Sequence, residues 1–144
     1  MLAVDTNVLV YAHRREPSEH DQAFEIMRGL VEGSAPWAIP WQCVYEFFSV
    51  VTNIKIWKAA ASTPEQASKQ IAAWFVSPEL RLLAEPDGFA TTLAGFLGQP
   101  RVRGPIVHDA RVAAICAAHG VERLLTRDRD FSLYPTLVTE NPFA

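Results

Sequence analysis

Short apolar runs alternate with longer amphipathic segments along the chain. The runs are three to five residues long and stand between turn-forming residues, as buried strands do. They cover residues 2–4, 37–39, 80–84 and 123–126, and residues 137–139 form a further candidate edge strand. Because strands that alternate with helices build parallel sheets, this pattern predicts an α/β fold. We expect a three-layer sandwich in which a short, mostly parallel central sheet carries helices on both faces.

Between these runs, apolar residues recur at the spacing of amphipathic helices. Ser18 with Asp21 resembles a capping box, and Gly33 is the glycine expected just past the end of the same helix. Thr63 and Gln66 supply an N-cap and its N3 partner for a later helix. The predicted helices cover residues 8–12, the stretch from 18 to 33, 41–53, the stretch that starts at 63, 87–97 and 106–119, the last one ended by Gly120.

The composition fits one ordinary globular domain. The chain has 144 residues, of which 49% are hydrophobic and 20% charged, so we expect one core and one domain over residues 1–144. The first residues contain no basic segment, Asp5 interrupts their apolar run, and no stretch reaches the ~20 apolar residues of a membrane span. We therefore expect a cytoplasmic protein without a membrane anchor, in which Cys43 and Cys116 are buried free thiols.

The formal net charge of −3 gives the chain no overall attraction to nucleic acid. A nucleic-acid site would therefore depend on local basic residues or on bound cations. We expect Arg14 and Arg15 to be solvated surface residues. The candidate phosphate contacts are four arginines that stand close to acidic residues in the sequence: Arg101, Arg103, Arg127 and Arg129.

Four acidic residues are predicted to meet at one edge of the sheet. Asp5 follows the first strand and Asp128 follows the fourth, so both leave the carboxyl ends of strands, where open α/β sheets bind ligands. Glu46 lies in the second turn of one predicted helix, and Asp109 lies in the first turn of another. If these helices follow the usual winding of the sheet, their N-terminal ends face the same edge.

Carboxylates gathered in this way repel each other, by about 4 kcal/mol for a pair ~4 Å apart near a protein surface. A folded protein retains such a cluster when cations or protons neutralise it. Oxygen ligands without histidine or cysteine favour Mg²⁺, with Mn²⁺ as a possible substitute, over zinc. Because such an ion lowers the pKa of a bound water and polarises a phosphoryl oxygen, the cluster predicts phosphodiester hydrolysis.

Smaller polar residues surround the predicted cluster. Thr6, Asn7 and Thr126 are suited to orient a carboxylate or a metal-bound water, although turns and helix caps use the same residue types. Asp130 fits the same turn as Asp128, and the sequence does not distinguish which of the two is the closer ligand. His108 is a candidate general acid, but a histidine in this position is more often structural or exposed.

Each acidic residue also has a simpler interpretation. Asp5 can be a plain N-cap and Asp109 can interact with the helix dipole, and these interpretations are favoured for each residue taken alone. Asp128 can be an ordinary turn residue. Glu46 is harder to explain in this way, because a carboxylate within an apolar run needs a partner. The joint placement of the four acids, rather than any one of them, supports a metal site.

Four segments of the chain resemble, in order, the motifs of PIN-domain proteins. Residues 3–12 (AVDTNVLVYA) resemble the opening motif, and residues 107–114 (VHDARVAA) resemble the third acidic motif. Glu46, which follows a strand and a proline, resembles the second acid, and residues 125–131 (LTRDRDF) resemble the fourth motif. The resemblance covers nearly the whole chain, and within the family it is strongest to the VapC-type toxins of bacterial toxin–antitoxin modules.

The resemblance implies a single PIN-like domain and a Mg²⁺-dependent endoribonuclease that acts as the toxin of a toxin–antitoxin system. It further implies an RNA substrate, a homodimer, and neutralisation by a cognate antitoxin protein that also binds operator DNA. The site that it implies consists of the acids Asp5, Glu46, Asp109 and Asp128, with Asn7, Thr126 and Asp130 in support.

Three other classes of protein compete with this interpretation. A haloacid-dehalogenase-type phosphatase needs a second aspartate where this chain has Asn7. A receiver-type phosphoacceptor domain needs a lysine after a late strand, whereas Lys55, Lys58 and Lys69 all lie in the wrong region. A non-catalytic binding module of the same fold is the remaining alternative, and such a module would bind RNA without cleaving it in the presence of Mg²⁺.

Overall fold

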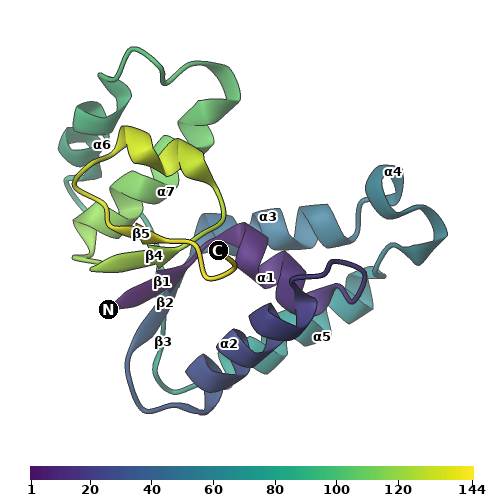
Figure 1. The fold of residues 1–144 in the computed structure, drawn as a ribbon. Coiled ribbons are helices and arrows are strands. Elements are labelled where there is room, and N and C mark those ends of the chain that lie inside the picture. The colour runs from purple at the N-terminus through teal and green to yellow at the C-terminus, as the bar shows by residue number, and fades with distance from the viewer.

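The computed structural model describes residues 1–144 and is built around one β-sheet. Its strands are β1 (Leu2–Val4), β2 (Trp37–Pro40), β3 (Leu80–Leu83), β4 (Arg123–Leu125) and β5 (Thr139–Glu140). They are ordered β3-β2-β1-β4-β5 (Figure 1), and each neighbouring pair is parallel. The predicted α/β class is therefore confirmed, with a sheet that is wholly rather than mostly parallel.

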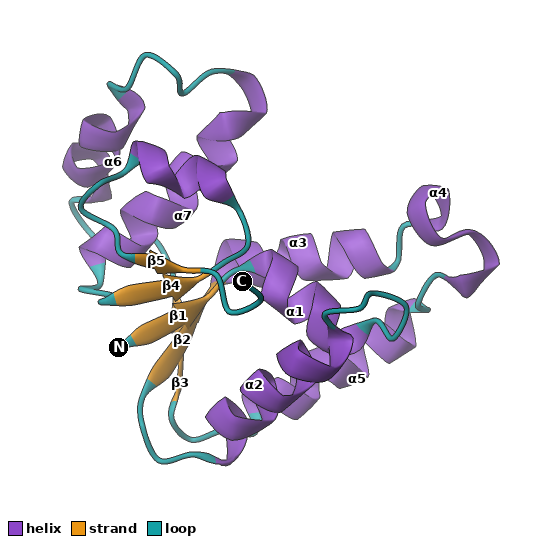
Figure 2. Cartoon of the chain, viewed as in Figure 1, coloured by secondary structure: helices purple, strands orange, loops and turns teal.

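Helices cover both faces of this sheet. They are α1 (Thr6–His13), α2 (His20–Glu32), α3 (Trp41–Val51), α4 (Ile54–Trp57), α5 (Pro64–Phe75), α6 (Phe89–Leu97) and α7 (Val107–Ala118), with the short 3-10 helices η1 (Lys58–Ala60), η2 (Gly104–Ile106) and η3 (Arg129–Leu133). Right-handed crossovers place α1, α2, α3 and α5 on one face, and α4 projects away from the sheet beyond the end of α3 (Figure 2). After β3 the chain returns across the sheet to place β4 on the other side of β1. The helices that follow β3 therefore lie on the other face (Figure 2), and they are α6, α7 and η3. No helix combines the length and the apolar character that crossing a bilayer requires.

The same reversal creates a crevice at the carboxyl ends of β1 and β4. The chain runs from β1 to β2 and β3 on one side, and β4 then pairs with the other side of β1, with Val4 opposite Leu125. Asp5 directly follows Val4, and its backbone N–H donates to the Leu125 carbonyl (3.0 Å). Open α/β folds bind ligands at this kind of position. The topology therefore brings Asp5 close to the residues that follow β4.

The core lies on both sides of β1 and β2, whose residues are almost entirely buried. Trp37 has no exposed surface, and its indole N–H donates to Ser77 Oγ (3.0 Å), which satisfies the polar atom of a large core residue. The helix α7 packs closely because its buried face carries small side chains such as Ala110 and Ala113.

Several helix-end and strand predictions are confirmed. Thr63 and Gln66 form a full capping box at the start of α5, and Gly120 follows α7 with a left-handed φ of 67°. Cys43 and Cys116 are both buried and free. The predicted edge strand exists as β5, shifted toward the C-terminus by about two residues, as is usual for sequence-based boundaries.

The predicted capping box at the second helix is wrong. α2 begins at His20 with Glu19 as its N-cap, and no side chain caps it, so Ser18 and Asp21 do not pair in this role. A tertiary contact lies at the helix start instead, because His20 Nδ1 forms a hydrogen bond with the Tyr11 carbonyl (2.8 Å). A contact between two helices thus outweighs the local capping pattern.

Two further helix ends differ from the predictions. Gly33 does end α2, but its φ is −77° rather than left-handed. A Cβ at this position would lie 2.7 Å from the Gly29 carbonyl oxygen, so the close approach of the backbone requires the glycine. The third helix ends at Val51 rather than at Asn53, because the Asn53 side chain accepts from the Lys55 backbone N–H and begins α4.

The prediction that Arg14 is a solvated surface residue is also wrong. Arg14 is only 6% exposed and forms a bidentate ion pair with Glu16 (2.7 and 2.9 Å). Its guanidinium also donates to the Ala60 carbonyl (2.8 Å) and Ser62 Oγ (3.2 Å), and it lies 4.1 Å from the ring centroid of Trp57. Arg14 therefore ties the end of α1 to the segment that joins α4 to α5.

We predict that Arg14→Leu lowers the free energy of unfolding by about 2–3 kcal/mol, because charge-assisted hydrogen bonds and a cation–π contact are lost at a buried position. Arg15→Leu is the matched control, since Arg15 is exposed, and it should change this free energy by less than about 0.5 kcal/mol. Urea unfolding followed by tryptophan fluorescence measures both variants. Equal losses in the two would contradict the structural role of Arg14.

Candidate active site

The carboxyl edge of β1 and β4 opens into a pocket of about 290 Å³. Asp5, Glu46, Asp109 and Asp128 all line this pocket, which we call the acidic pocket. The four acids that the sequence assigns to one edge of the sheet therefore do come together. The other residues that line the pocket are Thr6, Asn7, Val10, Tyr11 and Val50.

Asp5 is the most buried of the four acids, with 6% of its surface exposed. Its Oδ1 accepts from the Thr6 backbone N–H (2.8 Å) and faces the Cys43 thiol (3.6 Å). Its Oδ2 accepts from the Thr126 hydroxyl (2.7 Å) and the Asn7 amide (3.2 Å). Burial raises the pKa of Asp5, and hydrogen bonds to the carboxylate oppose that rise. Asp5 thus caps α1 and has a fixed place in the acidic pocket.

Thr126 and Asn7 join the turn after β4 to the start of α1. The Asn7 amide donates to Thr126 Oγ1 (3.0 Å), and its Oδ1 accepts from the Arg127 backbone N–H (3.0 Å). Thr126 Oγ1 accepts from the Asp128 backbone N–H (3.0 Å) while it donates to Asp5. One hydroxyl therefore links the Asp5 carboxylate to the turn that carries Asp128.

Glu46 is held from two sides in the second turn of α3. Its Oε2 accepts from the Thr6 hydroxyl (2.8 Å), and its Oε1 accepts from the Gln42 amide (2.7 Å). Thr6 belongs to α1 and Gln42 lies one turn earlier in α3, so the two bonds join Glu46 to both helices. Glu46 therefore has the hydrogen-bond partners that a carboxylate within an apolar run requires.

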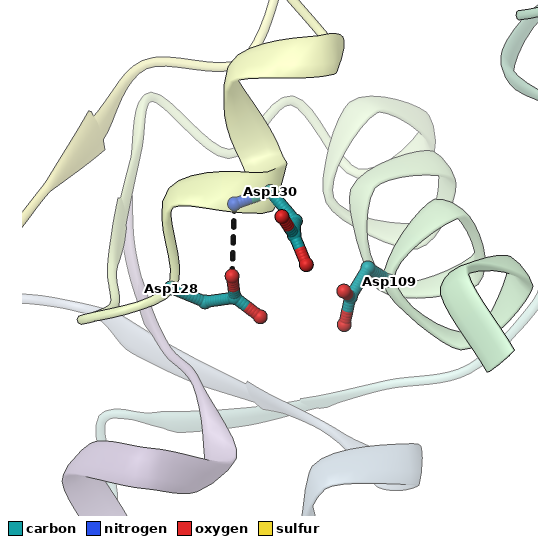
Figure 3. A group of neighbouring side chains, drawn as sticks. All are labelled: Asp109, Asp128 and Asp130. Carbon is teal, nitrogen blue, oxygen red and sulfur yellow. Dashed lines mark hydrogen bonds between the residues drawn. The ribbon is translucent and has the colours of Figure 1, made fainter. Parts of the chain in front are cut away.

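Asp109, Asp128 and Asp130 form a second group of carboxylates, drawn in Figure 3. One oxygen from each lies within 4.8 Å of the others. Asp109 comes from the first turn of α7, whereas Asp128 caps η3 by accepting from the Asp130 backbone N–H (2.8 Å). Asp128 lines the acidic pocket, but Asp130 is exposed and does not. This difference favours Asp128 over Asp130 as a ligand of a cation in the acidic pocket.

The negative charges act most strongly on Asp109. Its burial and then the charge of Asp128, followed by those of Asp5, Asp130 and Glu46, raise the pKa of Asp109 to about 7. No lysine or arginine forms an ion pair with any of these acids. A set of oxygen ligands without an internal counter-ion is suited to bind a divalent cation such as Mg²⁺ or Mn²⁺.

Two of the candidate arginines lie next to the acidic pocket. Arg127 and Arg129 line a wholly polar pocket of about 370 Å³ that shares Asp128 with it. The Arg127 guanidinium is already engaged, because it donates to Glu19 (2.7 Å) and to the Tyr11 hydroxyl (3.0 Å). Arg129 is exposed and forms no ion pair.

The other basic candidates do not line the acidic pocket. Arg101 and Arg103 are exposed in the segment between α6 and α7 and line none of the pockets. His108 is also exposed and faces a different pocket together with Phe89 and Arg111. The general-acid role of His108 therefore finds no support in this geometry.

Two residues of the site were missed by reasoning from the sequence. Cys43 faces Asp5, and Gln42 binds both Glu46 and the His108 carbonyl. The Gln42–Glu46 pair has the spacing of four residues that joins neighbours on a helix, so this contact carries a sequence signal. The contact with residue 108 joins segments far apart in the chain and carries none.

Comparison with known proteins identifies a protein family that matches this chain. A family model described as the PIN domain matches residues 2–137. The ribonuclease VapC48 of Mycobacterium tuberculosis is 27% identical over 140 residues, which cover 97% of this chain and 96% of that protein. The ribonuclease VapC43 of the same species is 28% identical over 142 residues, which cover 99% of this chain and 95% of that protein.

Solved structures share the fold over almost the whole chain. VapBC2 of Rickettsia felis, bound to a DNA fragment from its promoter, has a TM-score of 0.67 with 19% identity and covers 97% of both chains. VapC20 of Mycobacterium tuberculosis, a toxin that cleaves the sarcin–ricin loop, has a TM-score of 0.66 with 17% identity. The match covers 92% of this chain and 93% of the VapC20 chain.

We predict that metal-free protein loses stability as the pH rises toward 8, and that Asp109→Asn removes part of this loss. The folded chain keeps a proton on Asp109 up to about pH 7, whereas the unfolded chain releases it near pH 3.8. The stabilisation from this proton is complete below the lower value and disappears as the pH passes the higher one. At pH 8 the variant should be more stable than the wild type by about 1–2 kcal/mol, after a discount for partial exposure.

Urea unfolding in EDTA at pH 5.5 and pH 8 measures this difference. The control is Asp87→Asn, because Asp87 is exposed and lies outside the pockets. A wild type and an Asp109→Asn variant with the same pH dependence would refute the repulsion ascribed to Asp109.

Proposed function

This chain belongs to the PIN-domain family, and from this premise we propose that it is a Mg²⁺-dependent endoribonuclease that acts as the toxin of a toxin–antitoxin pair. The observation that carries the proposal is the meeting of Asp5, Glu46, Asp109 and Asp128 in one pocket at the carboxyl edge of β1 and β4. The names of the VapC relatives, which are ribonucleases, support the same reaction. We also propose that residues 1–144 act as one domain in the cytoplasm.

The residues of the acidic pocket fit a divalent cation. Every candidate ligand atom is a carboxylate oxygen, and the pKa of Asp109 is raised by its burial and then by negative charges that no ion pair within the chain balances. When bound, Mg²⁺ supplies positive charge and Lewis acidity toward a phosphodiester, and Mn²⁺ is a plausible chemical substitute. The residues that would hold the ion are Asp5, Glu46, Asp109 and Asp128, with Asp130 beside Asp109.

The chain's own contribution is to fix these groups before the substrate arrives. Thr126, Asn7 and the Thr6 backbone N–H hold the Asp5 carboxylate in one orientation, and the Thr6 hydroxyl does the same for Glu46. Such fixed ligands need little reorganisation when charge develops on the scissile phosphate. Burial and the neighbouring carboxylates raise the pKa of Asp109 to about 7 in the metal-free chain, and a bound cation would lower it and keep this carboxylate ionised.

The polar pocket next to Asp128 suits the RNA backbone. Arg129 offers a free guanidinium there. Arg127 offers a second one, which would exchange its bond to Glu19 for a bond to a phosphate. We propose that these two arginines contact phosphates beside the scissile bond, since arginine matches phosphate geometry. Arg101 and Arg103 do not line the acidic pocket, so we assign them no role in catalysis. We propose that they contact phosphates farther along the RNA.

The proposed partners follow from the family. A cognate antitoxin protein would neutralise the toxin, as the complexes named VapBC among the structural neighbours suggest, and would carry the contact with operator DNA. We further propose a homodimer as the assembly of the toxin. Coexpression with the neighbouring open reading frame, followed by size-exclusion chromatography with light scattering, tests both assemblies.

We predict that purified chain cleaves total cellular RNA into discrete fragments with Mg²⁺ and not with EDTA. Asp109→Asn should cleave at least about 100-fold more slowly, because a metal ligand is lost. The same variant is expected to be more stable than the wild type without metal, so unfolding cannot explain its loss of activity. Asp87→Asn, which keeps the acidic pocket intact, should cleave as the wild type does.

Two results would contradict the proposal. Folded wild-type protein, free of antitoxin, that binds RNA and leaves it intact with Mg²⁺ would instead indicate a non-catalytic binding module. Cleavage by Asp109→Asn at the wild-type rate would show that the acidic pocket is not the site of the reaction.

A further inference from the structure

Gln42 lies behind the acidic pocket rather than in it. It belongs to the first turn of α3, one helical turn before Glu46, and is only 4% exposed. It does not line the acidic pocket, so it is placed to act on the site only through its neighbours. A buried glutamine is costly unless its amide is satisfied, and its hydrogen bonds therefore indicate why it is tolerated there.

The amide of Gln42 has one orientation that fits its surroundings. Its Nε2 donates to Glu46 Oε1 (2.7 Å) and to the His108 carbonyl (3.0 Å), which uses both of its hydrogens. Rotating the amide by half a turn would direct Oε1 at these two acceptors and replace two attractions by two repulsions. The observed orientation instead leaves Oε1 buried without a partner. The two donated bonds are thus kept although an acceptor is left unsatisfied.

These two bonds connect elements that carry different acids. Glu46 stands on α3, and residue 108 stands directly before Asp109 in the first turn of α7. On its other oxygen Glu46 accepts from Thr6, which follows Asp5. A continuous chain of hydrogen bonds therefore runs from Thr6 through Glu46 and Gln42 to the start of α7, and it joins the segments that carry three of the four acids.

We propose that Gln42 is a positioning residue of the acidic pocket, which holds the Glu46 carboxylate and the first turn of α7 in place against the repulsion between Glu46 and Asp109. This inference rests on the metal site in the proposed function. Without the amide, Glu46 keeps only the bond to Thr6 and is free to turn away from the other acids, and α7 loses a tie to α3. Metal binding and cleavage then weaken although no ligand is removed.

Substitution by methionine separates this role from a role in folding. Methionine has nearly the same length as glutamine and fills the same buried space, and it removes the unsatisfied Oε1 together with the donated bonds. A residue that only packs the core would tolerate this change with full metal binding. A residue that positions Glu46 would not.

The test measures Mn²⁺ binding by calorimetry, RNA cleavage over a range of Mg²⁺ concentrations, and thermal unfolding. For Gln42→Met we expect a melting temperature in EDTA within about 3 °C of the wild type. We also expect a rise of about 10-fold in both the Kd for Mn²⁺ and the half-saturating Mg²⁺ concentration. Gln99→Met is the control, because Gln99 is exposed and does not line the acidic pocket, and it should match the wild type in all three measurements.

Gln42→Leu provides a second variant that removes the same donors with an apolar side chain of similar volume. Weaker Mn²⁺ binding in both folded variants supports the proposal. Wild-type Mn²⁺ affinity in either folded variant overturns it.

Two other outcomes are distinguishable from these. A fall of more than about 10 °C in the melting temperature of Gln42→Met would assign the residue to the fold and would also overturn the proposal. If wild-type protein binds Mn²⁺ but never cleaves RNA, the nuclease proposal fails, and the calorimetric comparison still decides the role of Gln42.

Discussion

The mutual repulsion of carboxylates at the carboxyl edge of β1 and β4 is the constraint on which the site depends. Nothing in the packing of an α/β sheet requires acids there, and the pKa of Asp109 near 7 reflects the burial and charge that their meeting imposes. The chain supplies no basic side chain to balance them. We propose that a divalent cation turns this unfavourable arrangement into a favourable one, since ligand binding stabilises the folded state that it requires.

The fold counters this repulsion with hydrogen bonds rather than with ion pairs. Thr126 and Asn7 hold Asp5, while Thr6 and Gln42 hold Glu46, and these donors come from α1, α3 and the turn after β4. Asp128 accepts from the Asp130 backbone N–H, whereas the Asp109 carboxylate has no such donor and shows the largest effect of the neighbouring charges. Cation binding is therefore expected to act mainly on Asp109 and the first turn of α7.

Much of the site follows from the sequence because parallel topology converts strand ends into neighbours. Asp5 and Asp128 follow β1 and β4, so they come close together once β4 pairs in parallel with β1. Gln42 was missed because its bond to residue 108 depends on how α3 and α7 approach each other. Arg14 was misjudged for a similar reason, since the segment between α4 and α5 covers it, and the capping pattern of Ser18 was outweighed by the contact of His20 with Tyr11.

An anomalous diffraction map of crystals grown with millimolar Mn²⁺ would show whether the acidic pocket binds a cation, because it locates the ion without relying on activity. We predict a manganese peak in the acidic pocket, within coordination distance of carboxylate oxygens from Asp5, Asp109 and Asp128. We also predict that Asp109→Asn lacks this peak. A well-ordered crystal with the pocket open to solvent and no peak there, or with manganese bound only elsewhere, would contradict the claim that these acids form a metal site.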